Sequence, residues 1–185
     1  MPSGFRAMLA RLITMCAVLV GAVAILLLDS VALAAEPRTE AFVCPVTEVN
    51  GGKGGIYGNE ALEVVLWPHS TIVFEPGTGF VDADGGMGVK VGWDRKRKGQ
   101  LEVGGRRLDG QAAPAYAYIS DGYGETGFQP IYLVFPTPGC WEIVGSVADA
   151  SLKYVVLVEK SGGGPTWRFE GLEPGWRVSH ESGAR

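Results

Sequence analysis

The chain has 185 residues, of which 16 are Lys or Arg and 20 are Asp or Glu, giving a formal net charge of −4 at pH 7. This mild acidity excludes a protein that is basic overall and binds nucleic acid through its whole surface. The two histidines and three cysteines show no spacing typical of a four-ligand zinc site, so no metal or cofactor is expected.

The N-terminal segment, 1–35, is predicted to be a signal peptide or a membrane anchor. Two arginines precede an uninterrupted apolar stretch at 12–28, and Ala32 and Ala34 then provide the small residues of a signal-peptidase site. This pattern favours cleavage after Ala34 or one residue later. A retained anchor is the alternative, because a membrane helix needs about 20 apolar residues. In either case we expect the protein to be secreted or to lie at the extracellular face of the cell membrane, with membrane contact only through this segment.

The segment 36–160 is predicted to be one all-β domain. Short runs rich in Val, Ile, Tyr, Phe and Trp alternate with glycine- and proline-containing turns about every 8–12 residues, as in sandwiches and barrels. No window has the period and length of a helix. The predicted strands are, in chain order, 40–46, 61–67, 71–75, 88–93, 100–105, 115–120, 130–135, 140–147 and 151–159.

Two cysteines remain beyond the N-terminal segment, Cys44 and Cys140. In a chain bound for an oxidising compartment, a single disulfide between them is expected. Closing a loop of nearly 100 residues would stabilise the fold by up to about 4–5 kcal/mol in the chain-entropy model. A catalytic cysteine would need a neighbouring histidine, and the chain offers only His69 and His180, so catalysis by Cys140 is disfavoured.

The stretch FPTPGCWEIVG at 135–145 predicts a corner between two strands. Its prolines end one strand, its glycine permits the turn, and Trp141 and Ile143 then share one face of the next strand. We expect Trp141 in the core, with Cys140 near the rim, where it holds the N-terminal part of the domain through Cys44. The last two predicted strands are expected to form a hairpin.

Two segments do not read as regular strands. NGGKGGIYGN at 50–59 is predicted to be a glycine-rich loop or linker, and it lacks the Gly-Lys-Ser/Thr ending of a phosphate-binding loop. The C-terminal extension, 161–185, contains Trp167, Phe169 and Trp176, which are unusual for a disordered tail. An extra strand, a partner-binding segment and a loosely ordered extension all remain open for it.

Four stretches of the sequence are similar to those of other proteins: LWPHSTIVFEPGTGFV, KVGWDRKRKGQLEVGGRRLDG, DGYGETGFQPIYLVFPTPGCWEIVG and ADASLKYVVLVEK. Together, from about Cys44 to Lys160, they resemble an uncharacterised family of exported bacterial single-domain proteins. The resemblance implies an immunoglobulin-like antiparallel β-sandwich behind a signal or lipoprotein anchor, and it assigns neither an activity nor a site. The basic DRKRK and the long C-terminal extension depart from the family pattern.

Six basic residues lie near the junction of the strands predicted at 88–93 and 100–105. They form a run between the strands and a pair after the second: Arg95, Lys96, Arg97 and Lys98, then Arg106 and Arg107. If the two strands form a hairpin, these residues gather at one end as a candidate polyanion-binding patch for anionic lipid headgroups, wall polymers or acidic glycans. The alternative is a hairpin loop of solvated charges that protects a strand edge. Export and the lack of interleaved aromatic residues argue against nucleic acid.

Two glycine-containing loops carry carboxylates, DADGG at 82–86 and SDGYGE at 120–125. Oxygen-rich loops of this kind can bind calcium, and the ligands here would be Asp82, Asp84, Asp121 and Glu125. The first loop lacks the closing Glu of a full calcium loop, and Asp-Gly is the commonest turn dipeptide. Turn formation is therefore favoured, and no metal is assigned.

Aromatic side chains alternate with small residues around the second loop: Tyr116, Tyr118, Tyr123, Phe128 and Tyr132. If exposed, they would form a stacking platform for a sugar or a peptide. If buried, they belong to the core and corners of the sandwich, which is the favoured interpretation.

Together these features predict an exported, disulfide-stapled, immunoglobulin-like antiparallel β-sandwich that acts as a non-catalytic binding or structural module at the cell envelope. No G-x-S-x-G or H-E-x-x-H signature is present. The alternative is an extracellular hydrolase that uses carboxylates of the two acidic loops, since paired carboxylates need no local motif. An envelope polyanion or a surface protein is the expected class of partner.

Overall fold

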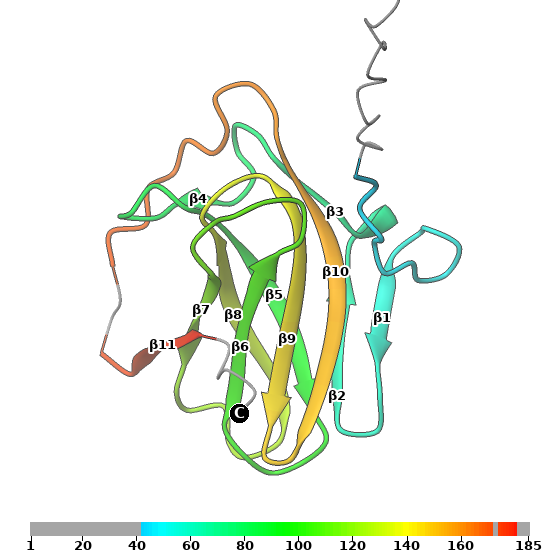
Figure 1. Cartoon of the computed structure of the whole chain (residues 1–185). Helices are drawn as coiled ribbons and strands as arrows, with labels where there is room; N and C mark the ends of the chain where they lie inside the picture. Colours follow the sequence, from blue (N-terminus) through cyan, green and yellow to red (C-terminus); the bar gives the residue numbers. More distant parts are fainter. Residues whose placement is uncertain (1–41, 172–173, 181–185) are drawn as a thin grey trace, which may run out of the picture. The chain divides into compact units, whose positions relative to one another are not determined.

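The computed structural model describes residues 42–171 and 174–180 (Figure 1). The predicted signal peptide or anchor at 1–35 lies outside these residues. Within the described ranges the fold is all-β, as predicted, with eleven strands and one short 3-10 turn, Pro68–Ser70. The same ranges contain no helix that has the length and apolar character needed to cross a membrane.

One sheet is organised around strand β5 (Met87–Arg95). Along one edge β5 pairs with β8 (Gly127–Phe135) over its whole length. Along the other edge it pairs with β4 (Phe80–Val81) at its beginning and with β2 (Leu62–Leu66) at its end. Strand β1 (Gly55–Gly58) extends the sheet beyond β2. All of these pairs are antiparallel.

The other sheet has six strands in the order β11-β7-β6-β9-β10-β3. Its antiparallel members are β11 (Trp176–His180), β7 (Ala115–Ser120), β6 (Leu101–Arg107), β9 (Gly139–Val147) and β10 (Ala150–Lys160). Strand β3 (Thr71–Phe74) lies parallel to β10 at the far edge, so the prediction of a purely antiparallel fold is wrong for this pair. The predicted hairpin of the last two core strands is confirmed, because Ala150 pairs with Val147 across a tight turn between β9 and β10.

The two sheets face each other across one apolar core. Trp93 of β5 packs against Tyr154 of β10, with ring centroids 5.9 Å apart. The same indole lies over Gly145 of β9, where a Cβ would stand 2.2 Å from the ring, so only glycine fits there. Phe135 at the end of β8 contacts Trp141 of β9 edge to face at 5.7 Å. The predicted core position of Trp141 is confirmed, since its side chain is fully buried.

The predicted disulfide between Cys44 and Cys140 is present, with Cα atoms 5.5 Å apart. Cys140 is itself buried, at the start of β9. The strand predicted at 40–46 is wrong for its described part: residues 42–46 form no ladder, and the Val46 amide donates to the Cys44 carbonyl at 2.9 Å. The disulfide and two hydrogen bonds between Thr47 and Val155 hold this segment beside β10 instead.

The other predicted strands are all present, with ends shifted by a few residues. The prediction missed three short ones. Strand β1 lies inside the segment read as a glycine-rich loop, and β4 has only two residues. Strand β11 lies in the C-terminal extension, for which an extra strand was one of the open alternatives.

Candidate functional site

The six basic residues of the candidate polyanion patch do not all lie together. Strands β5 and β6 belong to different sheets, so the segment 96–100 connects the two layers and is not the tip of a hairpin. Arg106 and Arg107 lie at the opposite end of β6 from this connection. The hairpin prediction is wrong because alternation within a strand identifies its two faces and does not identify its neighbours.

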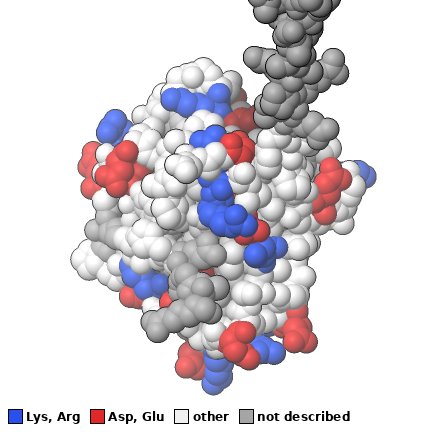
Figure 2. All heavy atoms as spheres, viewed as in Figure 1, with Lys and Arg blue, Asp and Glu red and all other residues white. Residues whose placement is uncertain are grey.

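Five of these six cations have a carboxylate partner. The pairs are Lys96–Glu63, Arg97–Asp149 at 2.9 Å, Arg97–Glu60 at 3.4 Å, Lys98–Glu125 at 3.1 Å, Arg106–Glu142 at 2.9 Å and Arg107–Asp109 at 2.6 Å. Figure 2 shows the same intermixing of blue and red side chains over the visible face. Exposed pairs of this kind contribute only about 0–1 kcal/mol each, but they reduce the positive field that a polyanion would meet.

Arg95 differs from the other five because its side chain is buried, with 3 % exposed. Nη1 donates to the carbonyls of Gly99 at 2.8 Å and Glu125 at 3.3 Å, and Nη2 donates to those of Tyr123 at 3.0 Å and Gly124 at 2.9 Å. Burial lowers the pKa of this guanidinium below its ordinary value, because the charged form loses hydration. The loop read as a candidate calcium loop therefore directs its carbonyl oxygens at an internal arginine.

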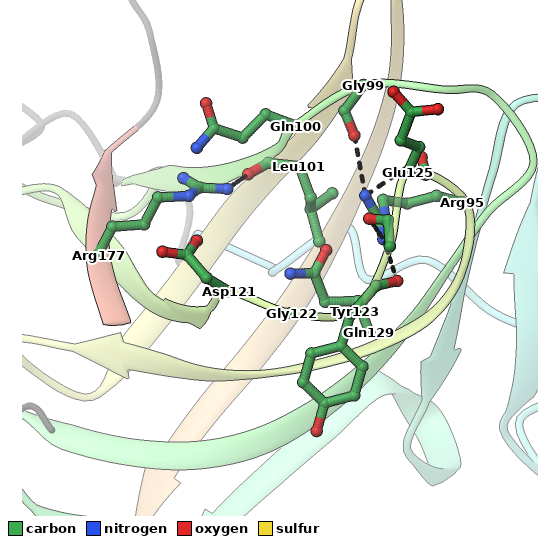
Figure 3. A pocket seen from close by; sticks show the side chains of 11 residues that line it. Arg95, Gly99, Gln100, Leu101, Asp121, Gly122, Tyr123, Glu125, Gln129 and Arg177 are labelled. Atoms are coloured by element: carbon green, nitrogen blue, oxygen red, sulfur yellow. Dashed lines mark hydrogen bonds between the residues drawn. The ribbon is translucent and has the colours of Figure 1, made fainter. Parts of the chain in front are cut away.

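A pocket of about 270 Å³ opens beside this loop (Figure 3). It lies at the end of the sheets where β5 and β7 finish and where β6 and β8 begin. We call it the Arg95–Arg177 pocket; its wall consists of Arg95, Gly99, Gln100, Leu101, Asp121, Gly122, Tyr123, Gly124, Glu125, Gln129 and Arg177.

Strand β11 supplies Arg177 to the pocket, so the C-terminal extension completes the wall. The Nη2 atom of Arg177 donates to the carbonyl of Leu101, the first residue of β6 (Figure 3). Ser179, also on β11, accepts a hydrogen bond from the Val103 amide at 2.8 Å. Burial is the main cause that lowers the pKa of Arg177, and the negative charge of Asp121 opposes it. The pocket thus depends on the docking of a strand that lies outside the predicted domain limits of 36–160.

Three buried polar atoms in the wall have no hydrogen-bond partner within the described ranges: Arg95 Nε, Gln129 Oε1 and Arg177 Nε. Gln129 is 5 % exposed, and its other amide atom, Nε2, donates to the Ser120 carbonyl at 2.9 Å. An unpartnered buried polar atom costs about 1–3 kcal/mol, and such atoms are rare in folded proteins. Within the described ranges five buried side-chain atoms lack a partner, and three of them belong to residues of this wall, which makes the pocket the strongest candidate site.

The acidic loop at 82–86 has a separate environment. Asp82 is buried and accepts hydrogen bonds from the hydroxyl groups of Tyr116 and Tyr118, the latter at 3.0 and 3.1 Å. Burial raises the pKa of both tyrosines, and the neighbouring Asp82 adds to the shift. Across the described part of the chain, no three His, Cys, Asp or Glu side chains are grouped closely enough to hold a metal ion. Asp82 is therefore placed as a structural acceptor, while Asp121 and Glu125 belong to the Arg95–Arg177 pocket.

The five aromatic residues, for which burial was favoured over an exposed platform, are divided among three places. The C-terminal extension covers Tyr116, Tyr118 and Tyr132: Tyr132 stacks on Trp176 at 5.3 Å, and Tyr118 contacts Phe169 at 5.2 Å. Tyr123 is 42 % exposed and lines the Arg95–Arg177 pocket. Phe128 is 60 % exposed and lines an apolar groove of about 330 Å³ on the other sheet. The structure forms no continuous aromatic platform from these five residues.

Sequence reasoning identified Arg95, Asp121 and Glu125 as candidates but missed Gln129 and Arg177. Gln129 could have been noticed in the sequence because it is the one side-chain amide in GFQPIYLVF, a strand whose other residues are largely apolar and buried. For Arg177 no local signal exists, because its role depends on how β11 pairs with β7.

Comparison with known proteins adds no relative from which a role might be transferred. No family model matches the chain, and neither a curated protein nor a solved structure matches it. The functional argument therefore depends on the chemistry of the Arg95–Arg177 pocket.

Proposed function

We propose that the protein is an exported, non-catalytic binding module of the cell envelope, built as an immunoglobulin-like β-sandwich, and that the Arg95–Arg177 pocket is its binding site. The observation that carries the proposal is the set of unpartnered buried atoms, two guanidinium Nε atoms and the Gln129 oxygen, in the wall of one pocket. These three atoms have almost no exposed surface, so a polar ligand would become their partner only after the side chains of the wall turn toward it.

Three features support the location and the fold type. The apolar segment at 12–28, followed by Ala32 and Ala34, has the pattern of an export signal. The Cys44–Cys140 disulfide is suited to an oxidising compartment. Two facing, mostly antiparallel sheets joined by short connections are consistent with an immunoglobulin-like sandwich and with the exported family that the sequence resembles.

The residues of the pocket favour binding over catalysis. Its wall contains no serine, cysteine, histidine or lysine to act as a nucleophile or a general base near neutral pH. Of its two carboxylates, Glu125 pairs with Lys98 at 3.1 Å and directs its own carbonyl at Arg95. Two arginines, two glutamines and an exposed tyrosine are groups that hold and orient a ligand.

The experiment is a titration of the mature, oxidised protein followed by ¹H–¹⁵N NMR. The probes are L-alanine, propionate, L-alaninamide, glucose and inorganic phosphate. We expect at least one probe to shift the backbone amides of residues 121–125 in the wild type, and Arg177→Gln to abolish the shifts. The matched control is Arg106→Gln, which removes an exposed, ion-paired arginine at the other end of β6 and should bind as the wild type does. Absence of any saturable shift with all five probes would overturn the proposal.

A further inference from the structure

We infer that the ligand of the Arg95–Arg177 pocket is a small zwitterion that carries a carboxylate and an ammonium group, as an amino acid does. This inference rests on the proposed binding function and concerns the chemical class of the ligand.

The pocket presents a positive and a negative group that do not neutralise each other. Arg177 and Asp121 both line it, and neither forms a salt bridge with a described residue. Their charges nevertheless influence each other, since Asp121 acts on the pKa of Arg177. A guanidinium and a carboxylate that share a pocket without pairing can each bind the opposite charge of one bipolar ligand.

The unpartnered atoms include both hydrogen-bond donors and an acceptor. Arg95 Nε and Arg177 Nε are donors that lack an acceptor, and Gln129 Oε1 is an acceptor that lacks a donor. Gln129 Nε2 is held by the carbonyl of Ser120, the residue before Asp121, so the glutamine is tied to the segment that carries the acidic group. A ligand with only an anionic group would leave the exposed Asp121 carboxylate without an oppositely charged partner, and one with only an ammonium group would leave Arg177 without one.

The remaining wall indicates a small and mostly polar molecule. The volume is about 270 Å³, and Leu101 and Tyr123 are its only apolar or aromatic side chains. Three glycines contribute backbone alone: Gly99, Gly122 and Gly124. An amino acid with a short side chain therefore suits the pocket better than an extended polymer does.

The test compares L-alanine with two analogues that each lack one charge: propionate has no ammonium group, and L-alaninamide has no carboxylate. We expect L-alanine to bind the mature protein at least about tenfold more tightly than either analogue, as measured by NMR titration at pH 7. Asp121→Asn should remove most of this preference over propionate by weakening L-alanine binding, while propionate binds as tightly as before or more tightly, because a negative charge near Arg177 is removed. Arg106→Gln should leave all three affinities unchanged.

Each contrary outcome has a separate meaning. If propionate binds as tightly as L-alanine, the pocket is an anion site, and if L-alaninamide does, it is a cation site. Either result overturns the inference of a zwitterionic ligand and leaves the proposed binding function standing. Phosphoethanolamine binding where L-alanine does not would overturn the carboxylate class. If none of these probes binds, nor glucose or phosphate, the proposed function fails together with the inference.

Discussion

The guanidinium of Arg177, on the last strand, lies close enough to that of Arg95, on β5, for the positive charge of Arg95 to act on it. Burial is the main cause of the lowered pKa of Arg177; the negative charges of Asp121 and Glu102 oppose it, and the charge of Arg95 adds a smaller lowering. Two partly dehydrated cations in one wall destabilise each other unless negative or dipolar groups surround them. Four loop carbonyls surround Arg95, whereas Arg177 has the carbonyl of Leu101 and an unpaired Asp121 nearby. A bound anionic group would add to the compensation that Asp121 and Glu102 already give Arg177.

The first prediction concerns the coupling between ligand and strand β11. Detachment of β11 removes Arg177 from the wall, so a ligand of the pocket should stabilise the docked strand. At L-alanine concentrations ten times the dissociation constant, amide hydrogen exchange in β11 should slow by up to about tenfold. Exchange in β1, which contributes nothing to the pocket, should remain unchanged. Equal exchange rates in β11 with and without ligand, at saturation, would contradict the coupling.

The disulfide gives a second prediction. Cys44→Ala should lower the free energy of unfolding by about 2–4 kcal/mol, because the unfolded chain is no longer cross-linked over a sequence separation of 96 residues. Thermal unfolding of the oxidised protein should show a decrease in Tm of several degrees or more. The reduced wild type serves as the control and should unfold near the variant. A variant with the Tm of the oxidised wild type would contradict a stabilising role.

A third prediction follows from the buried tyrosines. Because the pKa values of Tyr116, Tyr118 and Tyr154 are raised in the folded state, the unfolded chain releases these protons first as the pH increases. Their contribution to stability is complete below the unfolded value of 10.0 and is lost progressively as the pH rises above it. Urea denaturation at several pH values between about 8 and 11 should show this decline. Tyr154→Phe removes one titrating group and should make the decline shallower; stability independent of pH up to 11 would exclude the linkage.

The Asp82 cluster can be tested separately at neutral pH. Tyr118→Phe removes a hydroxyl that donates to the buried Asp82 carboxylate, and should lower the free energy of unfolding by about 1–3 kcal/mol. Tyr123→Phe is the control, because Tyr123 is exposed and donates no hydrogen bond within the described ranges. Urea denaturation at pH 7 measures both. Equal effects of the two substitutions would show that the carboxylate does not depend on the Tyr118 hydroxyl.

Gly145 provides a test of the contact between the two sheets. In Gly145→Ala the new methyl group would stand 2.2 Å from the Trp93 ring, so the sheets must separate or the indole must move. Overpacking of this kind lowers stability by about 1–3 kcal/mol. Gly163→Ala is the matched control, because a Cβ there meets nothing within 4 Å. A Gly145→Ala protein as stable as the control would contradict the packing of Trp93 on β9.

Export is tested on the protein isolated from its native host. Intact mass after alkylation without reduction should show a species that begins near Ala35 or Glu36 and carries no thiol label. A full-length species in the membrane fraction would instead identify the N-terminal segment as a retained anchor. A label on Cys140 in either fraction would contradict the disulfide in the exported protein.

Much of the fold is predictable from the sequence because its strands are amphipathic. Val89, Val91 and Trp93 alternate with Lys90 and Gly92, and this pattern marks β5 correctly. The pattern does not show which strands pair with each other. For this reason the segment after β5 was predicted to be the tip of a hairpin, whereas it connects the two sheets. Strand β1 was missed because glycine supplies half of its residues and has no side chain to show an alternation.

The site was less predictable than the fold. Arg95 belongs to a basic run in which three of the four side chains remain at the surface, and nothing local distinguishes the one that is buried. Alternate side chains of β5 point inward, and Arg95 falls on the inward-pointing set. The loop at 121–125 then closes around it. Arg177 reaches the same pocket only through the pairing of β11 with β7, a contact between distant parts of the chain.

If the N-terminal segment is retained as an anchor, the disulfide has a mechanical consequence. Tension applied before Cys44 passes through two sulfur atoms directly to Cys140, at the start of β9. Strand β9 lies between β6 and β10 inside the larger sheet, so the tension acts on an interior strand. The chain between the two cysteines contains the whole of the smaller sheet and cannot be pulled out while the bond is intact. Under traction, only the portion from β9 to the C-terminus can extend.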